Sequence, residues 1–116
     1  YVFGPDVARA NVLALTADLP GVVPGTLTSL NIGTGIGADV NELESMIRTA
    51  VGDALVRRGL GAALPPPEHG PPRPGDLRSN LVDASRAGVL LGWRPSVRLA
   101  DGLALTAEWF ATQPRG

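Results

Sequence analysis

The chain has 116 residues, a formal net charge of −1 and no cysteine. This length allows one domain with a modest core, and the near-neutral charge predicts no general attraction for nucleic acid or an anionic membrane. The lack of cysteine excludes disulfides and thiol chemistry, and the single His69 excludes a histidine-based metal cluster. No apolar run approaches the roughly 18–20 residues of a membrane span, so we expect a soluble, cytoplasmic protein.

The first half of the chain predicts strands alternating with helices. Residues 1–3 can form a short strand, and Gly4-Pro5-Asp6 then begins a helix, because proline and an acidic residue suit the first turn. Two prolines and two glycines within 19–28 end that helix, and 29–32 ("SLNI") is typical of a buried strand. A second helix is expected over 40–55, capped by Asp39 or Asn41, with an inward face of Val40, Leu43, Ile47, Ala50, Val51 and Ala54.

The second half opens with a long connector. Residues 57–76 hold six prolines and four glycines, which predict neither a helix nor a central strand. Residues 77–83 are expected to be extended, and a short helix should begin at Asp83 or Ser85 and end at Gly92. A last amphipathic helix is predicted from Asp101 to about residue 111.

A glycine-rich segment lies between the predicted strand 29–32 and the helix that follows it. Gly33, Gly35 and Ala38 fit the pattern G-x-G-x-x-[GA] of dinucleotide-binding turns. Asp53 stands 20 positions after Gly33, but the residues before Asp53 continue a helix and form no second strand. The pattern therefore favours a strand-to-helix turn over a phosphate-binding loop.

Several longer motifs resemble a known family. The stretch "NIGTG" is followed by an acidic amphipathic helix and then by "PRPGDLRSNLVDASRAGVLLGWRPSVRLADGLALTAEWF". Together with the opening "YVFGPDVARANVLAL", these motifs resemble the C-terminal part of extended short-chain dehydrogenases/reductases, the NAD-dependent epimerases and dehydratases of nucleotide sugars. The resemblance covers nearly all 116 residues in the same order.

The resemblance implies an α/β fold class. Residues 1–116 would form the C-terminal substrate-binding segment of such an enzyme, with the last strand of its sheet and a small substrate-binding subdomain, and without the Rossmann core. The family's glycine-rich cofactor motif and catalytic Tyr-x-x-x-Lys are not found here, and the chain contains no lysine at all. We expect NAD in the complete parent enzyme, no cofactor or metal bound by this chain alone, and no catalytic residue within it.

The resemblance also implies a substrate site. By position, Arg73 would contact the substrate diphosphate and Asp76 would accept hydrogen bonds from the nucleotide ribose. A guanidinium can pair bidentately with phosphate oxygens, and a carboxylate can accept from two vicinal hydroxyls. The alternative is that Arg-Pro-Gly-Asp is only a type II turn, with Pro74 at its second and Gly75 at its third position, and both interpretations can hold together.

Other polar and aromatic residues are expected to be solvated or to pack in the core, without a role in binding or catalysis. We read His69 as a solvated loop residue, Arg57 and Arg58 as a solvated helix end, and Trp93 and Trp109 as core aromatics.

Two functions remain open at this point. The first is the substrate-side part of a nucleotide-sugar epimerase or dehydratase that is inactive alone, either a fragment or a natural truncation. The second is a standalone binding or interaction module derived from the same fold. The partners expected for the chain are a nucleotide sugar and either the missing N-terminal Rossmann part or a second copy, because an unpaired strand at 29–32 or the helix 40–55 would leave surface to cover. A lone monomer with 29–32 paired inside its own sheet would favour the standalone module.

Overall fold

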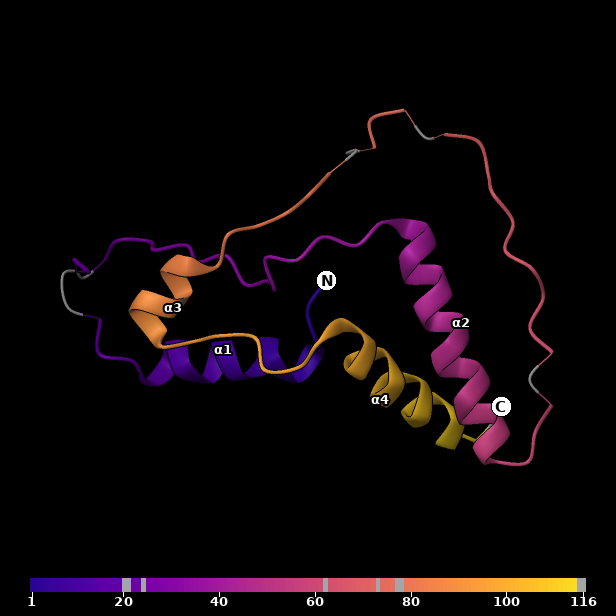
Figure 1. Cartoon of the computed structure of the whole chain (residues 1–116). Coiled ribbons are helices and arrows are strands. Elements are labelled where there is room, and N and C mark those ends of the chain that lie inside the picture. The colour runs from indigo at the N-terminus through magenta and orange to yellow at the C-terminus, as the bar shows by residue number, and fades with distance from the viewer. Residues whose placement is uncertain (20–21, 24, 62, 73, 77–78, 115–116) are drawn as a thin grey trace. The chain divides into compact units, whose positions relative to one another are not determined.

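The computed structural model describes residues 1–19, 22–23, 25–61, 63–72, 74–76 and 79–114. Figure 1 shows the helices that these residues form: α1 (Gly4–Thr16), α2 (Val40–Arg57), α3 (Ser85–Leu91) and α4 (Leu99–Thr112). All four helices predicted from the sequence are confirmed, with ends that differ by two residues or fewer for α2 and α4.

Contacts divide the chain into two compact units, each built from two separate stretches of sequence. The first unit combines Tyr1–Gly37 with Asn80–Arg98 and contains α1 and α3. The second combines Ala38–Ser79 with Leu99–Gly116 and contains α2 and α4.

The strands predicted from the sequence are not confirmed. Residues 1–3 and 29–32 have irregular backbone, and the described residues form no β-strand. A strand exists only through a hydrogen-bonded ladder to a neighbouring strand, and the described residues of the first unit supply no such neighbour to 29–32. The α/β class with a last sheet strand is thus not confirmed, and this part of the chain is helical.

The first unit packs around small side chains and one tryptophan. Ala10 of α1 and Ala87 of α3 are buried together with Leu91 and Trp93, while Leu30 and Ile32 pack against them from 29–32. Burial of Trp93, which is 1% exposed, confirms its interpretation as a core aromatic. The apolar pattern of 29–32 therefore reports contact with this core, which a strand and an extended loop can both make.

α3 ends as its sequence predicts, and this end places Trp93. Gly92 adopts φ +63, a left-handed conformation that glycine adopts without steric cost. The backbone N–H of Trp93 donates to the carbonyl of Ala87 at 3.3 Å, so the chain turns back against its own helix. At the other end, the helix begins at Ser85, one of the two starts predicted, and not at Asp83. The N–H of Ser85 donates to Asp83 Oδ1 at 2.8 Å, and this bond lowers the pKa of the Asp83 carboxyl.

A buried carboxylate ties the start of α1 to the segment after α3. Asp6 is 2% exposed and accepts hydrogen bonds from the N–H and Oγ of Ser96, at 2.9 and 2.6 Å, and from the N–H of Val97 at 3.1 Å. Arg9 forms an ion pair with Asp6 at 2.7 Å, and the Trp93 indole N–H donates to the Asp6 carbonyl at 2.8 Å. These donors, the Ser96 hydroxyl above all, outweigh the effect of burial and hold the pKa of Asp6 well below its usual value. The "DVA" and "W-x-P-S" motifs are therefore two sides of one structural network.

The second unit is a pair of packed helices, α2 and α4. Asp39 caps α2: its carboxylate accepts from the N–H groups of Asn41 and Glu42 at 2.8 and 2.9 Å, and Glu42 accepts in return from the N–H of Asp39. This reciprocal pattern is a capping box, so the cap predicted as Asp39 or Asn41 is Asp39. Ala50 and Ala54 are buried as predicted, whereas Val40 of the same predicted face is 75% exposed.

The sequence predicts that the two arginines at the end of α2 are solvated. In the structure both form ion pairs with one carboxylate. Arg57 and Arg58 donate to the two carboxylate oxygens of Glu108 on α4, at 3.2 and 2.8 Å, and these bonds lower the pKa of Glu108. Trp109, expected in the core, is 57% exposed and lies edge-to-face against Phe110. A solvated helix end and an ion-paired one have the same sequence, because the pair depends on how α4 packs.

Candidate functional site

The predicted substrate residues lie in the connector of the second unit. Pro74 and Gly75 form a turn in which Gly75 has φ +88, the left-handed value that the third position of a type II turn requires. Asp76 follows directly and is exposed, so its carboxylate is open to solvent. Arg73 lies outside the described residues, and the predicted pairing of Arg73 with Asp76 at one ligand stays a prediction.

The connector leaves α2 through a sharp reversal. Gly59 has φ +68, and the N–H of Leu60 donates to the carbonyl of Leu55 at 3.0 Å. A left-handed glycine with this six-residue hydrogen bond is a Schellman motif, which ends a helix and turns the chain back along it. The described residues 60–61 and 63–69, which we call the strap, then run beside α2 toward its N-terminal end.

An arginine of α2 holds the middle of the strap. Arg48 donates through Nη1 to the carbonyl of Leu64 at 3.3 Å and through Nη2 to that of Pro65 at 2.8 Å. Its Nε donates to Glu44 Oε1 at 2.8 Å, one helical turn earlier. The half-buried Leu64 adds an apolar contact with the same face of α2.

The far end of the strap has a second polar contact. His69 Nε2 lies 3.1 Å from the Asn41 side-chain oxygen in the first turn of α2. His69 is exposed, as expected for a solvated loop residue. Successive strap residues therefore contact α2 at its end, its middle and its start, and the Arg73–Asp76 loop comes four residues after His69.

The glycine-rich segment does not fit the pyrophosphate of a dinucleotide. In such sites the phosphate accepts from the first free N–H groups of the following helix. Here the Asp39 carboxylate already accepts from the N–H groups of Asn41 and Glu42, and a second carboxylate, Glu42, lies beside it. Gly33 instead packs against Val82, whose Cγ2 would lie 2.5 Å from an added Cβ, which explains the glycine by close packing.

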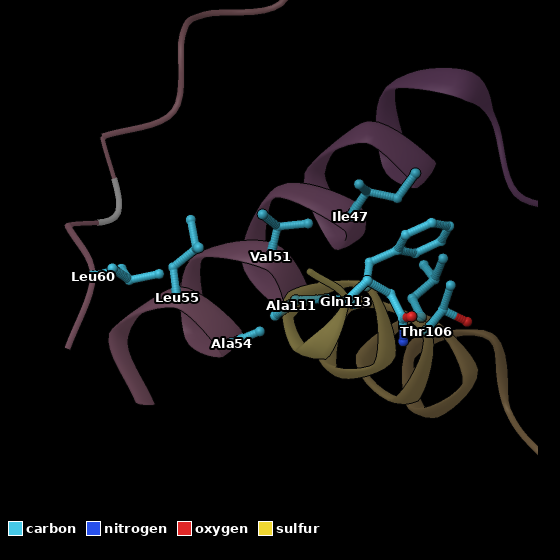
Figure 2. A pocket seen from close by; sticks show the side chains of 12 residues that line it. Ile47, Val51, Ala54, Leu55, Leu60, Thr106, Ala111 and Gln113 are labelled. Carbon is cyan, nitrogen blue, oxygen red and sulfur yellow. The ribbon is translucent and has the colours of Figure 1, made fainter. Parts of the chain in front are cut away.

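An apolar groove of about 430 Å³ lies between α2 and α4 (Figure 2). Thr106 and Gln113 are its polar lining residues, and the apolar ones are Ile47, Ala50, Val51, Ala54, Leu55, Leu60, Leu103, Ala107, Phe110 and Ala111. Among the described residues no cationic side chain lines it, so a diphosphate held by these residues would lose its hydration without a compensating charge. The groove is therefore unsuited to a nucleotide.

The described part of the chain has the features of neither a metal centre nor a membrane span. It contains no group of three or more histidine, cysteine or acidic side chains that could hold a metal ion. None of its helices has the length and apolar character needed to cross a membrane.

Comparisons with known proteins agree with the motifs. The chain is 41% identical over 110 residues to a UDP-glucose 4-epimerase from Mycolicibacterium smegmatis, covering 95% of this chain and 30% of that protein. It is 30% identical over 117 residues to a UDP-glucose 4-epimerase from Caenorhabditis elegans, covering all of this chain and 30% of that enzyme. A GDP-L-fucose synthase 1 from Arabidopsis thaliana is 34% identical over 84 residues, which are 72% of this chain and 23% of that protein. No family model and no solved structure matches the chain.

The chain thus spans about 30% of the length of the curated epimerases that it matches. It is homologous along its length to a segment of the UDP-glucose 4-epimerases, and this fits the C-terminal part of an extended short-chain dehydrogenase/reductase.

Proposed function

We propose that this chain is the substrate-binding part of an NAD-dependent nucleotide-sugar epimerase or dehydratase. The observation that carries the proposal is the 41% identity to a UDP-glucose 4-epimerase along 95% of the chain. The similarity to a GDP-L-fucose synthase supports the nucleotide sugar as the substrate class and leaves its base and sugar open.

Within this function, Arg73 and Asp76 hold the nucleotide diphosphate. The turn at Pro74 and Gly75 and the exposure of Asp76 support this role, since a ligand can reach the carboxylate from solvent. The arginine would pair with phosphate oxygens, and Asp76 would accept from the ribose hydroxyls.

The chemistry of the reaction falls to groups outside these 116 residues. The chain has no lysine and therefore no Tyr-x-x-x-Lys, and its glycine-rich segment does not fit a dinucleotide. NAD in the complete enzyme supplies reversible hydride transfer at a sugar carbon. This segment contributes binding and orientation of the substrate.

The proposal predicts that the complete enzyme turns over a nucleotide sugar and that the 116 residues alone do not. The complete enzyme should interconvert UDP-glucose and UDP-galactose, or turn over another nucleotide sugar, with NAD present. The 116 residues alone should give no turnover in the same coupled assay, because the acid/base groups are absent. Turnover by the isolated 116 residues would contradict the assignment of the chemistry to groups outside this chain. Failure of the complete enzyme to bind any of UDP-glucose, GDP-mannose or dTDP-glucose in calorimetry would overturn the proposed function.

A further inference from the structure

We propose that Arg48 is a positioning residue that fastens the strap to α2 and so sets the position of Asp76 and of the turn at Pro74 and Gly75 before it. The proposal rests on the proposed function for its ligand. In this proposal Arg48 touches neither nucleotide nor sugar, and it acts through the strap.

The sequence of the strap explains why an arginine is needed. Pro65, Pro66 and Pro67 have no backbone N–H, so this stretch offers a neighbour carbonyl acceptors and no donors. Such a segment forms no helix or sheet bonds of its own and has to be tied by a donor from outside. The guanidinium of Arg48 supplies two donors to consecutive carbonyls, those of Leu64 and Pro65.

A carboxylate on α2 fixes the orientation of the Arg48 guanidinium. Glu44 lies at i−4 on α2 and accepts from Arg48 Nε at 2.8 Å and from Nη2 at 2.7 Å. The Arg48 side chain is 34% exposed, so its bonds to the strap are partly shielded from water. With one edge of the planar fork held by Glu44, the remaining donors point in a defined direction toward the strap.

The connector is stiff because it is rich in proline, so the position of the strap also constrains the residues that follow it. Proline fixes φ near −65°, and prolines stand at 65–67 and again at Pro71 and Pro72, directly before Arg73. The contact between His69 and Asn41 lies between these two proline runs. A shift of the strap at Pro65 is therefore transmitted toward Asp76, with Glu68, His69 and Gly70 as the three positions between the runs.

The test compares Arg48→Ala, Arg48→Lys and the matched control Arg86→Ala in the complete enzyme. Arg86 is an exposed arginine on α3, in the other unit, so its replacement removes the same charge. Two quantities are measured: UDP affinity by calorimetry, and hydrogen exchange of peptides covering the strap. Alanine has a higher helix propensity than arginine, so Arg48→Ala should leave α2 folded, as exchange within α2 will report.

We expect Arg48→Ala to weaken UDP binding about three- to tenfold and to raise exchange in the strap, with exchange in α2 unchanged. Arg48→Lys should be intermediate in both readouts, because an ammonium can bond one carbonyl but cannot reproduce the fork. Arg86→Ala should match the wild type. Unchanged strap exchange in Arg48→Ala would overturn the fastening, and raised exchange with unchanged UDP affinity would overturn the positioning role. A wild type that binds no UDP would instead overturn the proposed function, while strap exchange would still decide whether Arg48 fastens the strap.

Discussion

Replacing Asp6 by alanine should lower the free energy of unfolding of the first unit by about 2–4 kcal/mol. The substitution leaves the backbone N–H groups of Ser96 and Val97 without the carboxylate that accepts from them. It also removes the ion pair with Arg9, although Arg9 is 40% exposed and can regain water. With a dependence of about 2 kcal/mol per M urea, the middle of the usual range, the unfolding midpoint should fall by about 1–2 M.

The measurement is urea unfolding followed by the fluorescence of Trp93. Trp109 is largely exposed and belongs to the other unit, so both proteins should carry Trp109→Phe to isolate the signal of Trp93. Asp18→Ala is the matched control, because Asp18 is an exposed aspartate in the same unit. Equal midpoints for Asp6→Ala and Asp18→Ala would show that the network adds nothing to stability.

The same network predicts an acid-dependent loss of stability. The pKa of Asp6 is lower in the folded chain than its ordinary value of 3.8, so the stabilisation is complete above that value and is lost as the pH falls below it. Glu108 and Asp83 also have lowered pKa values and contribute to the same trend. The difference in unfolding free energy between wild type and Asp6→Asn should therefore shrink from pH 6 to pH 3. A difference that stays constant over this range would contradict the ionised role of Asp6.

Replacing Arg73 by alanine in the complete enzyme should weaken nucleotide-sugar binding by about 1.5–3 kcal/mol, or roughly 10- to 150-fold. The reason is the loss of a charge-assisted contact to the diphosphate. Arg73→Lys should recover only part of the affinity, since lysine lacks the bidentate fork. Calorimetry with UDP-glucose measures the effect, and Arg86→Ala serves as the control for lost charge.

Replacing Asp76 tests the same site through the ribose hydroxyls of the nucleotide. If its carboxylate accepts from the ribose, the wild type should bind UDP more tightly than 2′-deoxy-UDP, and Asp76→Ala should reduce that preference. NAD binding should be the same in wild type and Asp76→Ala. Unchanged UDP affinity in both Arg73→Ala and Asp76→Ala would restore the plain-turn interpretation of these residues.

The sequence by itself determined the local features of this protein. The proline at the start of α1, Asp39 before α2 and Gly92 after α3 each act through neighbouring backbone, and each is found where predicted. The family resemblance was also carried by the sequence, because the motifs and their spacing are themselves the evidence.

Only the tertiary structure decided which distant groups meet. Asp6 and Ser96 stand 90 residues apart, Arg58 and Glu108 stand 50 apart, and Arg48 reaches Pro65 across 17, so no local pattern identifies these pairs. The predicted strand at 29–32 went unconfirmed for the same physical reason. An apolar alternation specifies burial, but a strand also needs a neighbour to share its hydrogen bonds, and that neighbour is a property of the fold.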